Sequence, residues 1–179
     1  MKTLVTSRLI LKPFSRDVIT ERYRTWLNDS EVYKYLETRG GYSMDMLKEY
    51  VDYSIDQKIH IWSIHLKENN KHISNIKIDP INIRHGFGEY GILLGDKTEW
   101  GKGYGKEASR KIIDYFFYEE YKLRKITLGV VAKNTNAVAL YKKIGFVLEG
   151  VYKKHVVYDN IFYDIIRMAI FNPEYTYDS

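Results

Sequence analysis

The sequence predicts an α/β protein whose central sheet is mixed, mostly antiparallel and flanked by helices. Apolar residues recur at helical spacing up to residue 55 and alternate with period two between residues 59 and 94. After residue 100, a glycine-rich turn precedes a helix, a strand, a second helix and two final strands. Antiparallel hairpins therefore come first, and a helical crossover in the middle of the chain makes the sheet mixed.

The first half of the chain predicts one strand, three helical stretches and a meander of strands. Arg8 to Phe14 alternates and forms the first strand. Ser15, Ser30 and Ser43 are each placed to cap a helix, because a hydroxyl accepts a hydrogen bond from a first-turn amide. The helical positions are Val18, Ile19, Tyr23, Trp26 and Leu27, then Val32, Tyr35 and Leu36, then Leu47, Tyr50, Val51, Ser54 and Ile55; the strands cover residues 59–66, 73–83 and 87–94.

The second half predicts a helix, a strand, a helix and a closing hairpin. The first helix begins near Tyr104, and Lys125 to Val131 is a strand rich in β-branched residues. Asn134 to Ile144 is amphipathic and is followed by Gly145, which suits a residue just past a helix end. The last two strands are Phe146 to Tyr158 and Ile161 to Phe171, joined by an Asp159-Asn160 turn.

Length and composition indicate one globular domain over residues 1–179. Hydrophobic residues make up 45% and charged residues 28%, which is enough for a core and argues against disorder. No linker, repeat or low-complexity tract interrupts the chain. The chain has no cysteine, which excludes a disulfide scaffold, a zinc finger, an iron–sulfur site and a cysteine nucleophile.

Charge and hydropathy predict a cytoplasmic protein without a membrane segment. The net charge is +5, but no run of five or six like charges marks a nucleic-acid-binding arm. A basic nucleic-acid-binding domain remains an alternative, and its binding would depend steeply on salt. Residues 1–8 lack the apolar core of a signal peptide, and no apolar run approaches the roughly 20 residues that span a bilayer.

The strongest local signal is the run Trp100-Gly101-Lys102-Gly103-Tyr104-Gly105-Lys106-Glu107-Ala108, which lies between a strand and a helix. Glycines at alternate positions let the backbone curl, so that several N–H groups face one anion. The positive end of the helix dipole adds to this field, as do Lys102 and Lys106. The run therefore predicts a site for a phosphate or a pyrophosphate.

Two common nucleotide motifs do not fit this run. A Walker A loop reads G-x-x-x-x-G-K-(S/T), whereas Gly101 and Gly105 are four residues apart and Glu107 replaces the Ser or Thr. A Rossmann fingerprint reads G-x-G-x-x-G, which is one residue longer, and needs an acidic residue where this chain has Val131. A nucleotide triphosphatase and a dinucleotide enzyme are both disfavoured.

The run resembles the coenzyme-binding signature of the GNAT superfamily of N-acetyltransferases, (Q/R)-x-x-G-x-(G/A). Trp100 stands at the Gln/Arg position, which is similar to the RimJ/RimL branch of ribosomal-protein N-terminal acetyltransferases, W-G-K-G-Y-(G/A)-x-E-A. Asn134 to Phe146 resembles the second family motif, and Arg8 to Pro13 resembles the opening strand. The resemblance covers most of the chain and implies the GNAT, or acyl-CoA N-acyltransferase, fold.

The resemblance implies acetyl-CoA as the acyl-donor substrate and no metal. The strand before the turn would splay open, so that its backbone binds the pantetheine arm and polarises the thioester carbonyl. Asn134 caps its helix and would also contact this arm, while Lys143 would meet the 3′-phosphate or adenosine end or remain solvated. The coenzyme-binding candidates are Leu93, Leu94, Trp100, Gly101, Lys102, Gly103, Tyr104, Gly105, Lys106, Asn134 and Lys143.

Two residues are candidates for proton transfer. Tyr141 matches the family's helix tyrosine that faces the coenzyme sulfur, and a phenol of pKa about 10 can protonate a thiolate of comparable basicity. Its alternative role is that of a core aromatic. Glu89, on the strand before the turn, is the candidate base, directly or through water, or else a solvated carboxylate; His85 and His155 are weaker alternatives.

The implied reaction moves an acetyl group from acetyl-CoA to a primary amine. A small-molecule acceptor is favoured, either a polyamine or an amino-sugar nucleotide. A protein N-terminal acetyltransferase and a non-catalytic acyl-CoA-binding module remain alternatives, and a homodimer remains open. The early helices and last hairpin should frame the acceptor site, with packing or surface as the other explanation for its candidates: Trp26, Glu31, Tyr33, Tyr35, Glu37, Arg39 and Tyr42.

Overall fold

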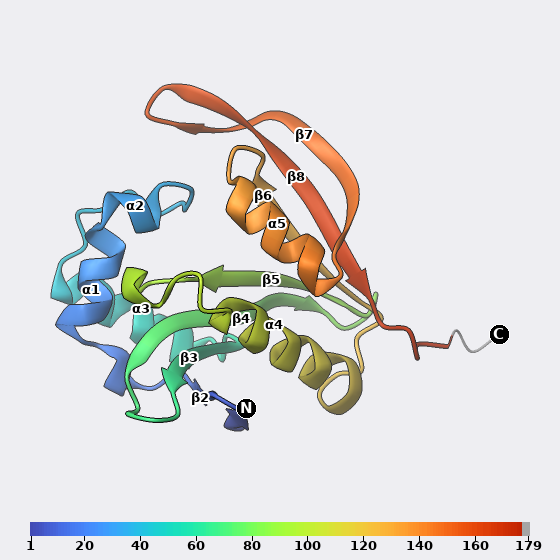
Figure 1. The fold of residues 1–179 in the computed structure, drawn as a ribbon, viewed down its shortest axis with the longest axis horizontal. Helices are drawn as coiled ribbons and strands as arrows, with labels where there is room; N and C mark the ends of the chain where they lie inside the picture. The colour runs from blue at the N-terminus through green and yellow to red at the C-terminus, as the bar shows by residue number, and fades with distance from the viewer. Residues whose placement is uncertain (177–179) are drawn as a thin grey trace.

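The computed structural model describes residues 1–176 and has the predicted class. Helices flank an eight-stranded sheet with the strand order β1-β2-β3-β4-β5-β6-β8-β7 (Figure 1). Neighbouring strands in it are antiparallel, except that β5 and β6 are parallel. The crossover that contains α4 connects this pair, as the sequence predicts for a mixed sheet.

The elements follow the predicted order, with additions that are too short for periodicity to mark. The strands are β1 (Leu4–Val5), β2 (Leu9–Pro13), β3 (Ile61–Leu66), β4 (His72–Asn82), β5 (Phe87–Leu93), β6 (Lys125–Val131), β7 (Val147–Tyr158) and β8 (Ile161–Phe171). The helices are α1 (Glu21–Asn28), α2 (Ser30–Tyr33), α3 (Met44–Asp56), α4 (Tyr104–Asp114) and α5 (Thr135–Ile144), with short helical turns at Arg16–Val18, Lys97–Glu99 and Tyr115–Glu119. Within residues 1–176, each helix is too short or too polar to cross a membrane.

Side chains cap the starts of α1, α2, α3 and α5, and the structure corrects two of the predicted caps. Ser43 and Asn134 cap α3 and α5 as predicted, because their side chains accept hydrogen bonds from first-turn amides. Ser15 makes no such bond, and Thr20 caps α1 instead. Asp29, one residue before the predicted position, caps α2. Each of these two segments holds more than one side chain able to cap, so residue type alone does not select the helix start.

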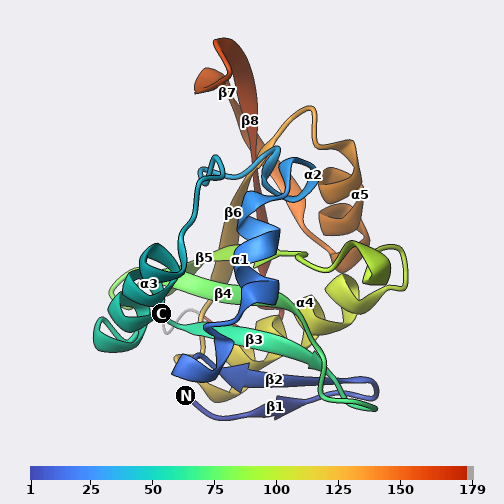
Figure 2. The same cartoon turned by 90° about the vertical axis from the view of Figure 1, so that its left-hand side faces the viewer.

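Helices cover both faces of the sheet. On one face, α4 and α5 form a core with strand residues such as Trp62, and Ile112 is fully buried there. On the other, α1 and α3 bury Trp26, Leu47 and Ile61 (Figure 2). Ile61 and Trp62 are neighbours in β3 that enter different cores, because successive side chains of a strand point to opposite faces.

The hairpin of β7 and β8 extends beyond the rest of the sheet (Figure 1). Its turn residues, Asp159 and Asn160, have positive φ angles of 50° and 61°, which a two-residue hairpin turn favours. The tip contacts the segment after α2, where Arg39 forms an ion pair with Asp159. Segments more than a hundred residues apart in the chain therefore meet at this point.

Candidate active site

The parallel pair β5–β6 opens into a wedge. Pairing begins at Phe87 with Lys125 and ends at Glu89 with Thr127, although β5 continues to Leu93. Beyond this point the ladder between the two strands gives the β5 backbone no partner. Unpaired backbone groups at a strand edge can bind an extended ligand as an added strand would.

The last residues on the β5 side of the wedge are held by side chains from neighbouring segments. Ser74 donates a hydrogen bond to the Leu93 carbonyl at 2.6 Å. The Trp100 indole donates one to the Leu94 carbonyl at 2.9 Å, although 44% of Trp100 is exposed. Trp100 therefore closes the loop between β5 and α4, and both leucines predicted to meet the thioester have fixed carbonyls.

The three glycines of the turn serve different purposes. Gly101 and Gly103 have φ angles of +77° and +84°, a left-handed conformation that other residues adopt only with strain. Gly105 is helical, but a Cβ there would lie 3.3 Å from Leu94 and 3.5 Å from Leu140. Two glycines therefore shape the turn, and the third lets α4 approach the end of β5 and helix α5.

The N-terminus of α4 presents free amides to the surface of this turn. Gly103 is the cap residue and has no side chain to occupy them. Among the residues described, the Lys106 ammonium forms no ion pair, whereas Lys102 is bound to Glu99 at 2.7 Å. The free amides, the helix dipole and Lys106 together make a positive site for an anion.

Arg8, which sequence reasoning assigned only to the opening strand, holds the turn in place. Its guanidinium donates to the Lys102 carbonyl at 3.0 Å and to Glu107 at 2.7 Å, and it lies 4.5 Å from the centre of the Tyr104 ring. Burial favours the protonated form of Glu107, but hydrogen bonds from Thr6 and Arg8 outweigh it and lower the pKa of Glu107 to about 2. The sequence did carry a signal for this contact, because Glu107 in the turn motif and Arg8 in the opening motif have opposite charges.

Tyr141 lies on α5 against the wedge. Its ring meets Tyr90 of β5 edge-on at 5.7 Å and Phe146 at 5.9 Å. Burial raises the pKa of Tyr141 to about 12, so the phenol is protonated at neutral pH. Among the described residues its hydroxyl has no hydrogen-bond partner, and it is not one of the fully buried unpartnered polar atoms, so it reaches accessible space. The structure therefore brings Tyr141 to β5 at the residue after the last pair with β6.

Glu89, the candidate base, is held inside the sheet. Its two carboxylate oxygens accept hydrogen bonds from the two terminal nitrogens of Arg167, each at 2.7 Å, and Oε2 also accepts one from Thr127 at 2.5 Å. These contacts join β5, β6 and β8 at the closed end of the wedge. His85 and His155 are exposed, in the turn before β5 and on the β7–β8 hairpin.

A cavity of about 290 Å³ lies between the early helices and the strands β4 and β5. It reaches Leu93 at the end of β5. Its lining is formed by Tyr23, Leu27, Leu36, Glu37, Thr38, Tyr42, Tyr50, Ile61, Asn75, Ile76, Lys77, Gly91, Ile92 and Leu93. This is a candidate acceptor site, because a ligand in it would end beside the residue predicted to meet the thioester.

Of the seven predicted acceptor residues, Glu37 and Tyr42 line the cavity. Trp26 is buried in the core, where it packs on His72 at 4.8 Å. The other four make contacts elsewhere: Glu31 with Lys97, Tyr33 with Arg39, Tyr35 with the Lys133 carbonyl, and Arg39 with Asp159.

Sequence reasoning missed Tyr23, Tyr50, Asn75 and Lys77 as lining residues. The two tyrosines occupy apolar positions of their helices, and the other two lie in a strand. Their common location depends on how α1 and α3 pack on β4, which no local pattern encodes.

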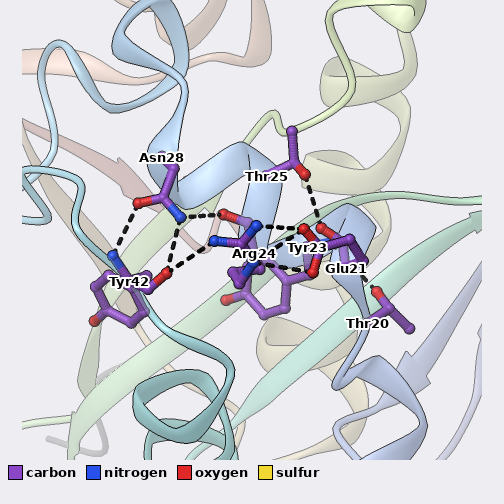
Figure 3. A network of polar contacts seen from close by, with 7 residues as sticks. All are labelled: Thr20, Glu21, Tyr23, Arg24, Thr25, Asn28 and Tyr42. Carbon is purple, nitrogen blue, oxygen red and sulfur yellow. Dashed lines mark hydrogen bonds and ion pairs between the residues drawn. The ribbon is translucent and has the colours of Figure 1, made fainter.

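The wall that carries Tyr42 is fastened to α1 (Figure 3). Asn28 accepts a hydrogen bond from the Tyr42 amide at 2.8 Å and donates one to the Tyr42 carbonyl at 2.9 Å. Arg24, which also pairs with Glu21, donates to the same carbonyl at 3.3 Å. The loop after Gly41 is therefore fixed at the cavity edge rather than free to fold over it.

The opposite edge of the cavity is joined to the β7–β8 hairpin. The Tyr158 hydroxyl donates to Glu37 at 3.0 Å. Arg39 pairs with Asp159 and lies between the rings of Tyr33 and Tyr158, at 5.5 and 4.9 Å. We call these contacts of Tyr33, Glu37, Arg39, Tyr158 and Asp159 the latch.

A wedge between parallel strands, a glycine turn at a helix start and an adjoining cavity are the features expected of an acyltransferase. Residues 8–147 match the family model described as an acetyltransferase (GNAT) domain, and the chain belongs to this family. The predicted fold class is thereby confirmed, and the protein is an acetyl-CoA-dependent acetyltransferase.

Two relatives of known sequence match most of the chain at low identity. An uncharacterized N-acetyltransferase p20 of Bacillus licheniformis is 29% identical over 179 residues, covering 98% of this chain and 99% of the relative. A spermidine N(1)-acetyltransferase of Vibrio cholerae is 27% identical over 133 residues, covering 68% and 76%.

Among solved structures, a spermidine N-acetyltransferase from Vibrio cholerae in complex with CoA and spermine has a TM-score of 0.84 and 25% identity, covering 93% of this chain and 97% of that one. A GNAT acetyltransferase from Bacillus anthracis also has a TM-score of 0.84, at 24% identity, covering 96% and 99%. These likenesses agree with the family assignment.

Proposed function

We propose that this enzyme acetylates the primary amine of a small molecule by direct attack within a ternary complex with acetyl-CoA, and that residues 1–179 act as one catalytic domain. The observation that carries the proposal is the cavity of about 290 Å³ that reaches Leu93. The relatives named for spermidine acetylation support a small-molecule amine.

In this proposal, acetyl-CoA lies along the wedge. The amides around Gly101, Gly103, Tyr104 and Gly105 hold the pyrophosphate, with Lys106 nearby. Trp100 and Lys102 stabilise the shape of the turn, since the indole donates to the Leu94 carbonyl and the ammonium is paired with Glu99. The remaining contacts are Leu93 and Leu94 at the thioester, Asn134 at the pantetheine arm and Lys143, which is exposed, at the adenosine end.

Acetyl transfer then needs one nucleophile and one acid. The neutral amine attacks the thioester carbonyl, a nitrogen–carbon bond forms, and the carbon–sulfur bond breaks. Tyr141 gives its proton to the departing thiolate, and a proton leaves the new amide nitrogen. Backbone N–H groups near Leu93 stabilise the charge that develops on oxygen, a contribution of about 3–4 kcal/mol for one such donor.

Of the two routes considered for deprotonating the amine, we propose the water-mediated one. Glu89 has both oxygens engaged by Arg167 and a third hydrogen bond from Thr127. These hydrogen bonds hold the carboxylate between the strands, and Glu89 is not among the residues that line the cavity, so it is not placed to contact the amine directly. Glu89 then positions β5 relative to β6, and water in the cavity carries the proton to solvent.

A protein N-terminus is the second candidate acceptor, favoured by the likeness of Trp100 to Ala108 to the RimJ/RimL branch. The latch favours a small-molecule acceptor over a protein N-terminus. Glu37 and Arg39 bind the hairpin tip across one edge of the cavity, which limits the room for a polypeptide to enter.

Thiol release from acetyl-CoA across a panel of small amines and N-terminal peptides tests the proposal. Turnover with a small amine and weaker turnover with every peptide is the expected result. Peptides as the better substrates would replace the first candidate with the second. Binding of acetyl-CoA without thiol release from any acceptor would favour a non-catalytic acyl-CoA-binding module.

A further inference from the structure

The polar side chains that line the acceptor cavity are mostly uncharged. Its lining includes one carboxylate, Glu37, and one ammonium, Lys77. Glu37 lies at the exposed edge and already accepts a hydrogen bond from Tyr158. The other polar side chains are the hydroxyls of Tyr23, Tyr42, Tyr50 and Thr38 and the amide of Asn75.

Asn75 is a buried donor without an acceptor. Only 3% of this residue is exposed, and Nδ2 has no hydrogen-bond partner among the described residues. It comes near enough to the Tyr23 hydroxyl to oppose in part the rise in the pKa of Tyr23 that burial causes, but forms no hydrogen bond with it. A buried amide left without an acceptor costs about 1–3 kcal/mol, so a ligand oxygen at this position would be stabilising.

His72 fixes the direction of that donor. Its Nε2 lies 2.8 Å from Asn75 Oδ1 and 3.1 Å from the Ser74 carbonyl. Burial lowers the pKa of His72 to about 4, so the neutral ring carries its one proton on the nitrogen that faces these two oxygens. Asn75 therefore presents its oxygen to His72, and its buried Nδ2 is the end left without an acceptor.

Lys77, two residues further along β4, is a half-buried donor that also lines the cavity. Its stem lies over Gly91 of β5, where an added Cβ would come 3.2 Å from Cε. Within residues 1–176, no carboxylate pairs with its ammonium. Residues i and i+2 of a strand are about 7 Å apart on one face, so Asn75 and Lys77 flank a single ligand.

We infer that the acceptor is a monoamine that carries an oxyanion, either a carboxylate or a phosphate, and that a polyamine is a poor substrate. This inference rests on the proposed function and narrows its substrate class. A polyamine would bring several positive charges to a cavity with one carboxylate, and a desolvated cation without a partner is costly. An oxyanion instead gives Lys77 and Asn75 an acceptor, and a monoamine brings only the one ammonium, which must lose a proton before it attacks.

Matched amines that differ in one group test the inference on the wild-type enzyme. 4-Aminobutyrate, 1-aminobutane and 1,4-diaminobutane share one carbon chain and differ in a carboxylate, a methyl or a second ammonium. Glucosamine 6-phosphate against glucosamine tests the phosphate source. The expected result is that at least one oxyanion-bearing amine exceeds its matched partners about tenfold in kcat/KM for thiol release.

Charge reversal at the cavity gives an independent readout. Lys77→Glu should lower kcat/KM for the oxyanion-bearing amine at least tenfold and raise it for 1,4-diaminobutane. Asn75→Ala should raise KM for the same substrate. Lys67→Glu, an exposed lysine in the β3–β4 turn, should change neither preference. Unchanged melting temperatures and unchanged affinity for acetyl-CoA would show that the variants remain folded.

These experiments distinguish a failure of the inference from a failure of the proposed function. Higher kcat/KM for 1,4-diaminobutane or spermidine than for every oxyanion-bearing amine would overturn the inference and leave the proposed function intact. Preference for N-terminal peptides would overturn both the inference and the small-molecule proposal. Thiol release from no amine, with acetyl-CoA still bound, would remove the catalytic proposal itself.

Discussion

Tyr141 combines a buried ring with a hydroxyl that reaches accessible space. Its ring is packed between Tyr90 and Phe146, and its hydroxyl has no hydrogen-bond partner among the residues described, without being one of the fully buried unpartnered atoms. Fully buried tyrosine hydroxyls usually find a partner, because an unmade hydrogen bond costs free energy, whereas an accessible hydroxyl can meet water or a ligand. A phenol kept protonated and unpaired at the edge of the wedge is suited to give its proton to a bound thiolate.

Tyr141→Phe should leave the Kd for acetyl-CoA within about twofold and lower kcat at least tenfold, since positioned acids contribute about 10²–10⁴ in rate. Steady-state kinetics and calorimetry measure the two quantities. Tyr53→Phe removes a hydroxyl from an exposed tyrosine of α3 and should change neither. Near-normal turnover of the Tyr141 variant would remove this residue from the proposed chemistry.

Glu107 makes a stability prediction with a defined pH range. Its pKa falls from 4.5 to about 2 on folding, so its contribution is fully present above pH 4.5 and is lost as the pH falls towards 2. The shift corresponds to about 3 kcal/mol at neutral pH. Glu107→Gln should therefore lower the free energy of unfolding at pH 7, and the difference from wild type should shrink between pH 4.5 and 2.

Denaturant unfolding at several pH values measures this difference. Glu21→Gln is the matched control, because Glu21 pairs with Arg24 on an exposed helix surface where ion pairs add little. A gap between Glu107→Gln and wild type that stays constant from pH 7 to 2 would contradict the assignment.

Residues inside a local motif were the ones that sequence reasoning could find. Gly101, Gly103 and Asn134 lie in runs of fewer than a dozen residues whose backbone role is set by their neighbours. Asn75 and Lys77 belong to a strand whose alternation says which side chains share a face but not what covers that face. They became visible only once helices α1 and α3 were placed against β4.

At the scale of elements, Gly101 of the glycine turn has a well-matched control position elsewhere in the chain, Gly41. Gly101 and Gly41 have φ angles of +77° and +75°, and an added Cβ at either would meet nothing within 4 Å. Alanine at either site thus costs backbone strain of about 1–2 kcal/mol without a steric clash. Only Gly101 belongs to the turn at the start of α4.

Gly101→Ala should therefore weaken acetyl-CoA binding at least tenfold, whereas Gly41→Ala should lose similar stability and keep its coenzyme affinity. Calorimetric titration and thermal unfolding of both variants test this. Equal affinities in the two variants would mean that the conformation of Gly101 is not part of coenzyme binding.

Element boundaries were predictable where composition and tertiary packing agree. β6 and β8 begin and end where the sequence predicts, and α5 follows its asparagine cap and ends before a glycine. The sequence predicts one helix from Ser15 to Leu27, whereas the structure has a short turn followed by α1. The apolar spacing fits one continuous helix as well as a turn followed by a helix, so periodicity alone could not locate the break.

At the scale of the whole molecule, the latch connects the start of the chain to its end. It joins the segment after α2, whose Glu37 lines the cavity, to the tip of the β7–β8 hairpin. Because the hairpin extends beyond the rest of the sheet, these interactions are expected to decide how open the acceptor site is.

Arg39→Ala should raise KM for the amine several-fold and leave the Kd for acetyl-CoA unchanged, since the wedge and the glycine turn lie apart from the latch. Initial-rate kinetics at saturating acetyl-CoA give the first value. Arg16→Ala, which breaks an exposed pair with Asp52 on another surface, should leave KM unchanged. An equal effect of both substitutions would mean that the latch does not control access.

The short register between β5 and β6 has a consequence for the integrity of the sheet. Within residues 1–176, three residue pairs make up the backbone ladder that joins its first five strands to its last three. A pantetheine chain lying in the wedge would connect these two parts of the sheet, because it would complete hydrogen bonds that the polypeptide leaves unmade. Acetyl-CoA should then slow amide hydrogen exchange from Tyr90 to Leu93, so that the donor substrate also serves as a structural component of its own enzyme.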